Sequence, residues 1–203
     1  RMPAITVVTP PATPPVTLTE IKSHLRLEIS DSTQDVLLTD LAEAATESLK
    51  EFLNRALVSQ TVDYTIDRFP GVDYIKLPGG DLQSITSLTY TDSAGSPTIF
   101  AASNYFALTN RVPGRLNLGF QKLWPTATLQ PRGGIVIRYI VGYGAAPAVP
   151  AAIKQALLMQ VGGMFMARAD VIIGQGLTPV TLDRAITNLR GPYQIRDFDS
   201  LPP

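Results

Sequence analysis

One long amphipathic stretch, residues 32–57, constrains the fold more than any other part of the chain. Asp31 or Ser32 can cap a helix there, and Asn54 suits the left-handed position that ends one. Small residues within the stretch would let a second helix approach closely. Five apolar residues recur at helical spacing and would form one stripe: Leu38, Leu41, Ala45, Leu49 and Phe52. We therefore predict a long helix on which much of the chain packs.

Two other stretches predict helices that could pack on this long helix. Thr17 and Glu20 have the spacing of a capping box, which indicates a short helix directly after them. Helical spacing returns at Pro150, and its apolar face runs towards Arg168. The pair Gly162–Gly163 interrupts this last helix and favours close contact with another backbone. We expect that contact to be made with the long helix.

Between the helical parts the apolar period changes to two residues, which indicates strands. Val62, Tyr64 and Ile66 alternate with polar residues, and residues 135–143 form the most apolar strand-like run. Further short strand-like segments are separated by turn signals, such as residues 92–95. This spacing favours an antiparallel sheet or small barrel over a parallel βαβ sheet. The predicted class is α+β, a small helical bundle with an inserted antiparallel β-sheet or small barrel.

The predicted organisation is a single domain with extended termini. Its parts are a helical part (residues 17–57 and 150–170), a β insertion (58–145), an N-terminal arm (1–16) and a C-terminal arm (171–203). Each arm is interpreted either as a loose terminus or as a segment that docks on a neighbouring protein. The last part of the C-terminal arm carries possible anchors for such docking: Tyr193, Ile195, Arg196, Phe198 and Leu201.

Charge and composition narrow the classes of function. Lys and Arg number 17, as do Asp and Glu, so no basic field favours nucleic-acid binding as the main task. Cysteine is absent, which excludes thiol catalysis and zinc–thiolate sites. His24 is the single histidine, and Asp63 and Asp67 are most simply solvated strand positions. No apolar run approaches the ~20 residues that span a bilayer. We therefore predict no catalytic, cofactor or metal site.

Four segments share their order and spacing with a known protein family. They are residues 17–27, the helix exit at residues 54–61, residues 141–156, and Arg168 at the end of the last long helix. Together they resemble the head–tail connector proteins of tailed bacteriophages, also called head-completion or adaptor proteins, in the version with a β insertion. The resemblance covers about residues 5–195, and it departs from the family at residues 160–169, where a more aromatic and polar helix end is expected.

The resemblance implies a structural role in a virus particle. It implies a ring of about twelve subunits beneath the portal, which extends the DNA channel and offers a docking surface to the tail or stopper. It also implies assembly in the bacterial host cytoplasm, location in the virion neck, and double-stranded DNA that passes without specific binding. On this basis we interpret the C-terminal arm as a docking arm for the portal protein.

The polar side of the long helix carries carboxylates at a regular spacing. Glu43, Glu47 and Glu51 are four residues apart and lie opposite the apolar stripe. One interpretation is an ordinary solvated face. The other is that these side chains line the channel of the ring, where they repel DNA phosphates and let the duplex slide.

Two other classes of function stay open on the sequence alone. One is a monomeric module that holds a ligand or a glycan on the β insertion, and the other is an enzyme with an unrecognised site. A concave pocket lined by aromatic residues would favour either of these. A defined ring formed with the portal protein would favour the connector.

Overall fold

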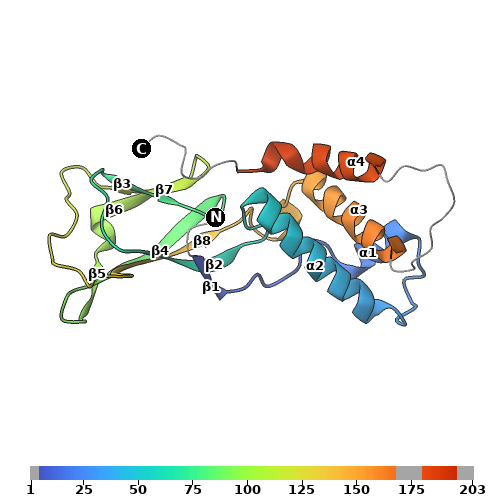
Figure 1. Ribbon diagram of the computed structural model, residues 1–203, viewed down its shortest axis with the longest axis horizontal. Coiled ribbons are helices and arrows are strands. Elements are labelled where there is room, and N and C mark those ends of the chain that lie inside the picture. The colour runs from blue at the N-terminus through green and yellow to red at the C-terminus, as the bar shows by residue number, and fades with distance from the viewer. Residues whose placement is uncertain (1–4, 168–179, 196–203) are drawn as a thin grey trace. The chain divides into compact units, whose positions relative to one another are not determined.

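The computed structural model describes the backbone of residues 5–167 and 180–195 (Figure 1). It describes the side chains of the same residues except 180–183. The chain divides into two compact units. The β unit contains residues 5–12, 54–144 and 195 of the described chain, and the helical unit contains residues 13–53, 145–167 and 180–194.

The β unit consists of two antiparallel sheets. One has five strands in the order β1-β2-β8-β4-β5, and the other has three in the order β3-β7-β6. The strands are β1 (Ile5–Thr9), β2 (Gln60–Ile66), β3 (Tyr74–Leu77), β4 (Leu82–Thr91), β5 (Pro97–Phe100), β6 (Tyr105–Leu108), β7 (Gly114–Leu118) and β8 (Ile135–Val141). A short 3-10 turn, η1 (Ala102–Asn104), precedes β6. The prediction of an inserted antiparallel β structure is confirmed.

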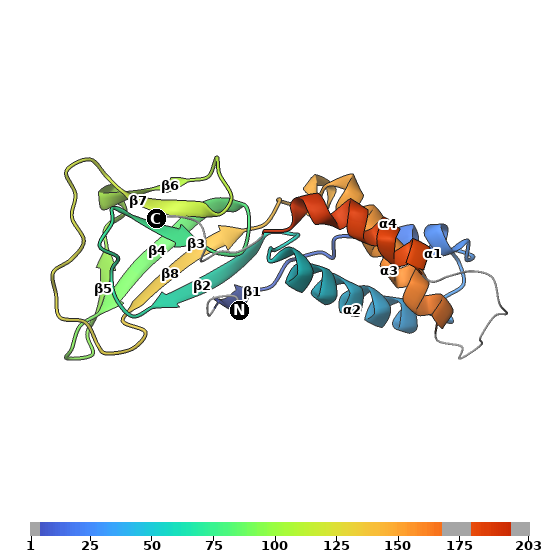
Figure 2. The same cartoon turned by 45° about the horizontal axis from the view of Figure 1, so that its top comes forward.

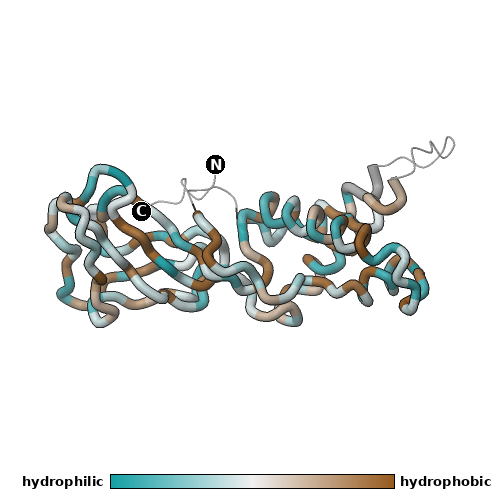
Figure 3. Tube along the Cα trace, turned by 90° about the horizontal axis from the view of Figure 1, so that it is seen from below, coloured by the Kyte–Doolittle hydropathy of each residue, from teal (hydrophilic) through white to brown (hydrophobic). Residues whose placement is uncertain are grey.

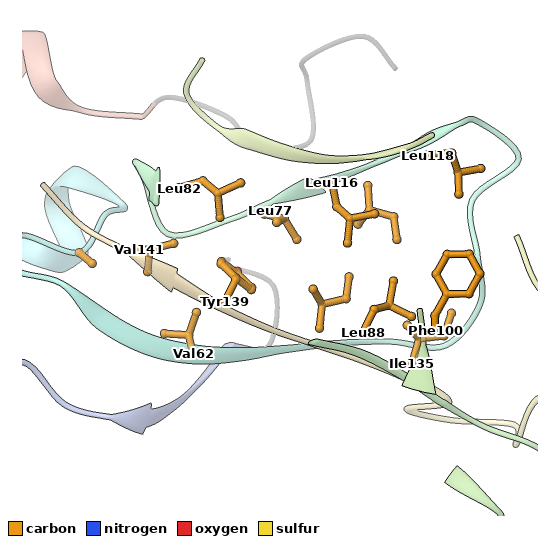
Figure 4. Packing of buried hydrophobic residues seen from close by; sticks show 13 residues of the cluster. Val62, Leu77, Leu82, Leu88, Phe100, Leu116, Leu118, Ile135, Tyr139 and Val141 are labelled. Carbon is orange, nitrogen blue, oxygen red and sulfur yellow. The ribbon is translucent and has the colours of Figure 1, made fainter. Parts of the chain in front are cut away.

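Apolar side chains from both sheets meet in one core between them (Figure 4). Strand β8 shows most clearly that every second side chain enters this core. Its buried residues are Ile135, Ile137, Tyr139 and Val141, and the residues between them are only partly buried. The Tyr139 hydroxyl donates a hydrogen bond to the Pro78 carbonyl at 2.9 Å, and burial raises the pKa of this tyrosine. Alternation with period two therefore builds a core from strands that are far apart in sequence.

Part of the expected N-terminal arm is an edge strand of the same chain. In β1, Ile5 lies opposite Tyr64 and Val7 lies opposite Val62 of β2. Ile5 also packs against the buried core, so both backbone hydrogen bonds and apolar contact hold the segment. Residues 5–9 are thus extended, and they pair with a strand of their own chain.

The helical unit is built from four helices in the described residues (Figure 2). They are α1 (Leu18–Leu25), α2 (Asp35–Leu53), α3 (Ala151–Ala167) and α4 (Val180–Arg190), with short 3-10 turns η2 (Ala146–Ala148) and η3 (Gly191–Tyr193). Helix α3 packs against each of the other three. Hydrophilic and hydrophobic residues alternate along the helices and strands in Figure 3, as expected for elements with one covered side. Helix α4 lies inside the range that was expected to form the C-terminal arm.

The long helix is shorter than predicted at its start and ends as predicted. It begins at Asp35, because the Asp31 carboxylate accepts a hydrogen bond from the Thr33 N–H at 2.9 Å and closes a turn before the helix. At the other end Asn54 has the expected left-handed backbone, with a φ of 53°. In the apolar stripe Leu38, Ala45 and Leu49 are buried, and Leu41 and Phe52 are partly buried.

The glycine pair of α3 provides a correction. A Cβ atom added at Gly162 would lie 3.6 Å from Leu25 Cδ2 and 3.7 Å from His24 Nε2, so this glycine faces α1 and not α2. The expected contact with the long helix was wrong for this residue. Helix α3 has neighbours on several sides, and its apolar pattern alone does not say which of them a given residue meets.

Candidate interaction surfaces

The face of α2 opposite its buried stripe is acidic. Glu43, Glu47 and Glu51 are all exposed, as is Asp40 one turn earlier. The ion pairs of the described residues involve other carboxylates. Like charges four residues apart weakly destabilise a helix, so burial of the opposite face must hold α2. The structure thus presents the three predicted glutamates on one exposed face of the helical unit.

The segment after α4 is held against its own chain where it is described. In the helical unit, Gln194 Nε2 donates a hydrogen bond to the Phe52 carbonyl at 2.9 Å. In the β unit, Asn54 Nδ2 donates a hydrogen bond to the Ile195 carbonyl at 3.0 Å. These amides were missed by the sequence analysis, because a lone amide side chain carries no local signal of its partner.

Only two of the five predicted docking residues lie within the described residues. Tyr193 and Ile195 are both partly buried. The guanidinium of Arg190 lies over the Phe52 ring, 3.9 Å from its centre, and so fixes the end of α4 directly before this segment. The other three predicted residues, Arg196, Phe198 and Leu201, lie outside the described residues.

A buried lysine organises the connection between α1 and α2. Lys22 is 4% exposed, and its ammonium group donates hydrogen bonds to the carbonyls of Ile29 at 3.1 Å and Asp31 at 2.6 Å. It also pairs with Asp35 Oδ1 at 2.5 Å. A charged group is stable in this position because its donors are satisfied. The sequence analysis missed this role, since a lysine on a short helix is normally solvated.

The two strand aspartates have structural partners. Asp63 forms a two-point ion pair with Arg138, with both N–O distances 2.8 Å, and this contact raises the pKa of Arg138. Asp67 Oδ1 accepts a hydrogen bond from the Gly133 N–H at 2.7 Å. The interpretation as a simply solvated position is therefore wrong for Asp63, which is partly buried in an ion pair with a residue far along the sequence, while Asp67 is exposed.

The described residues contain no group of three or more His, Cys, Asp or Glu side chains that could hold a metal ion. His24 is exposed on α1, with Gly162 of α3 beside its ring. No helix within the described ranges is both long and apolar enough to cross a membrane.

Comparison with known proteins gives a family match for part of the chain. Residues 15–92 match the model of the phage gp6-like head–tail connector protein family, which confirms the resemblance predicted from the sequence. This range includes α1, α2 and the strands β2 to β4. No curated protein matches the sequence.

Three solved structures share the fold over nearly the whole chain. A chain in the neck of an empty GTA particle, computed with C6 symmetry, has a TM-score of 0.78, is 20% identical, and is matched over 98% of this chain and 100% of that one. A chain in the neck of the native GTA particle, computed with C12 symmetry, has a TM-score of 0.75 at 19% identity. The match covers 98% of this chain and 100% of that one.

A chain in the virion of the native gene transfer agent (GTA) particle has a TM-score of 0.73 at 22% identity. The match covers 98% of this chain and 99% of that one. These likenesses confirm the predicted α+β class and extend over both units. The chain therefore has the fold of chains found in the necks of these particles, and its residues 15–92 carry the sequence pattern of phage gp6-like head–tail connector proteins.

Proposed function

We propose that this chain is a structural head–tail connector, an adaptor in the neck of a tailed phage or a phage-like particle. The observation that carries the proposal is the fold match over 98% of the chain to a chain of a solved particle neck, together with the family match at residues 15–92. Both units of the chain fall within the structural match, so the β unit is part of the shared design.

The proposed assembly is a ring of about twelve copies, by analogy with the C12 symmetry of one matched neck. A twelvefold ring also obeys sixfold symmetry, so the C6 symmetry of the other neck fits the same copy number. In this ring the chain would extend the DNA channel below the portal protein and offer a surface to the tail or stopper protein.

The C-terminal segment is the proposed contact with the portal protein. Gln194 and Arg190 hold its beginning on α2 through Phe52, so the chain beyond it starts from a fixed point. The proposed contact residues are Tyr193, Ile195, Arg196, Phe198 and Leu201, of which two are aromatic and two aliphatic. Such anchors bind well when they enter pockets on a partner.

The acidic face of α2 is the proposed lining of the channel. Glu43, Glu47 and Glu51 are exposed in each copy. A ring would repeat them around its axis, and the resulting negative wall would repel DNA phosphates. A basic wall would instead bind DNA through counterion release. DNA would therefore pass without specific binding.

The proposed role needs no catalysis and no cofactor, in keeping with the structural particles in which the matched chains lie. We place the protein in the virion neck, after assembly in the cytoplasm of the bacterial host. The alternative of a monomeric glycan-binding or ligand-binding module gains no support from the family match or the structural matches.

The test is assembly with the portal protein of the same particle. The purified chain is mixed with portal rings, and the mass and symmetry of the product are measured by analytical ultracentrifugation and electron microscopy. We expect a closed ring of this chain on one end of the portal. A chain that stays monomeric and unbound at micromolar concentration would contradict the proposal.

A further inference from the structure

The three-stranded sheet β3-β7-β6 has an outward face that combines aromatic and basic side chains. Leu77 of β3 and Leu116 and Leu118 of β7 enter the core, so the residues that alternate with them point away from it (Figure 4). The strand register places these outward residues in two rows: Tyr74, Asn117 and Phe106 in one, and Lys76, Arg115 and Leu108 in the other. We refer to these six positions as the outer β face. They include two cations and no carboxylate.

Two aspartates flank β3, and neither of them balances the cations of the outer β face. Asp73 directly precedes Tyr74, so the alternation of the strand turns it to the opposite side. Asp81 pairs with Arg55, with Nη1 and Oδ2 3.3 Å apart. Arg111 is exposed in the loop between β6 and β7 and adds a further positive charge beside this sheet. The outer β face is therefore suited to a segment that carries carboxylates.

Three polar atoms of the outer β face are out of contact with solvent and have no hydrogen-bond partner among the described residues. They are Tyr74 Oη, Arg115 Nε and Asn117 Oδ1. The guanidinium of Arg115 lies over the Tyr74 ring, 4.0 Å from its centre, which holds the two side chains together. A polar atom without water and without a partner costs free energy. A segment that brings both acceptors and backbone N–H groups would supply the partners.

The described chain ends beside this sheet. The Ile195 carbonyl accepts a hydrogen bond from Asn54 Nδ2 at 3.0 Å. The next residue, Arg55, forms a β-bridge with Gly79, which lies two residues after the end of β3. All of these residues belong to the β unit. The segment that follows Ile195 therefore starts from a point close to one end of β3.

The eight residues that follow Ile195 match the outer β face in length and in charge. At about 3.3 Å per residue an extended segment of this length spans about 26 Å, twice the length of a four-residue strand such as β3. Asp197 and Asp199 are two residues apart, so both carboxylates would lie on one side of such a segment. Arg196 is its single cation and comes first, next to the fixed end.

We propose that the outer β face binds residues 196–203 of its own chain and holds the docking arm there until the portal protein takes it. Asp197 and Asp199 would face Arg115 and Lys76, and the backbone of the segment would supply the remaining partners. Binding to the portal protein then competes with binding to the outer β face, so the arm is covered while no portal ring is present. The role of the portal protein in this inference rests on the proposed function.

The first experiment locates the segment in the free chain. A photo-reactive phenylalanine analogue replaces Ser200 in the full chain, which keeps both aspartates. The chain is irradiated at low concentration, and cross-linked peptides are identified by mass spectrometry. We expect links within one chain to peptides that contain β3, β6 or β7. Links to the helical unit alone, links between copies alone, or no links at all would overturn the inference.

The second experiment tests the charges that hold the segment. Arg115→Gln should lower the yield of these links about two- to fivefold, the range expected for one partly exposed ion pair. Arg111→Gln is the matched control and should leave the yield unchanged, because Arg111 lies in a loop outside the outer β face. Circular dichroism confirms that each variant is folded. A loss for Arg115→Gln no larger than that of the control would overturn the inference.

The third experiment measures competition with the portal protein. The double variant Asp197→Asn with Asp199→Asn removes both carboxylates and keeps the anchors Phe198 and Leu201. Because this variant releases the arm from the outer β face, we expect its Kd for portal rings to be about two- to fivefold lower than that of the wild type. An equal or higher Kd would show that the outer β face does not withhold the arm.

The two proposals fail in different ways. If the wild-type chain does not bind portal rings, the proposed function is wrong, and the cross-links of the free chain still decide whether the outer β face binds the segment. If the wild-type chain binds portal rings and no links to β3, β6 or β7 form, only this inference is wrong.

Discussion

The ammonium group of Lys22 lies 2.5 Å from the Asp35 carboxylate, joining the middle of α1 to the first residue of α2. The same ammonium group binds the carbonyls of Ile29 and Asp31. One buried cation therefore satisfies backbone acceptors of the connecting loop and also pairs with the first residue of the long helix. Negative charge at a helix start is favoured by the helix dipole, so the position of Asp35 stabilises α2 as well.

Replacing Lys22 with methionine should destabilise the helical unit. The change keeps the buried stem but removes three contacts, and we expect unfolding free energy to fall by about 2–3 kcal/mol, the usual value for hydrogen bonds to a charged group. Urea unfolding followed by circular dichroism measures the loss. Lys50→Met on α2 is the matched control, since none of the ion pairs among the described residues involves Lys50. A loss for Lys22→Met no larger than that of the control would show that the network contributes little.

Replacing Gly162 with alanine should stabilise the protein. A Cβ atom there meets its nearest neighbour at an ordinary 3.6 Å, and alanine is favoured over glycine inside a helix by about 1 kcal/mol. Gly142→Ala should have the opposite effect, because its φ is 124° and the added atom would lie 2.6 Å from the Val58 carbonyl oxygen. The melting temperatures of the two variants, compared with that of the wild type, test both predictions. A lower melting temperature for Gly162→Ala would mean that α1 and α3 pack more closely than described.

The capping box of α1 should make stability depend on pH in the acid range. Glu20 Oε2 accepts a hydrogen bond from the Thr17 N–H at 2.6 Å, and this bond lowers the pKa of Glu20 below its ordinary value of 4.5. A lowered folded-state pKa means that the stabilisation is present above the unfolded value and is lost as pH falls through the folded value. Glu20→Gln should therefore reduce the slope of stability against pH below about 4.5. An unchanged slope in denaturant titrations would contradict this.

Reversing the acidic face of α2 should affect DNA passage and not assembly. Glu43→Lys, Glu47→Lys and Glu51→Lys together keep the side chains exposed, so the fold and the proposed ring should remain intact. DNA release should become slower, most visibly at low salt, where charges are least screened. The control changes the same three residues to Gln, which removes the charge without reversing it. Its rate of DNA release should lie between those of the wild type and the Lys variant. If DNA release from the Lys variant matched the wild type, these residues would not line the channel.

Deleting residues 198–203 should separate folding from portal binding. The deletion leaves α4, η3 and the contact of Gln194 with Phe52 in place, so the melting temperature should stay within about 4 °C of the wild type. Binding to portal rings, measured by co-sedimentation, should be lost because the deletion removes Phe198 and Leu201. Gln194→Ala provides the complementary variant, since it loosens the start of the segment but keeps those anchors. Full portal binding by the truncated chain would rule out the proposed docking arm.

The features that the sequence alone predicted correctly are local. The capping box of Thr17 and Glu20 forms as expected, and Asn54 ends the long helix in the left-handed conformation. The alternation at residues 60–66 correctly predicted the half-buried strand β2 with Val62 in the core, and the apolar run at residues 135–143 correctly predicted β8. The helix caps depend on interactions that span a few residues, and the spacing of apolar residues along a strand is itself a local pattern.

The tertiary structure decided what depends on contacts between distant segments. It placed residues 5–9 beside β2, turned Gly162 towards α1, and buried Lys22 under the α1–α2 loop. It also paired Asp63 with Arg138 and placed Arg115 over the Tyr74 ring. A local pattern says that a residue is apolar, charged or able to turn, but not which distant surface satisfies it. That choice is made only when the elements pack, because packing determines which apolar areas and polar groups are removed from water together.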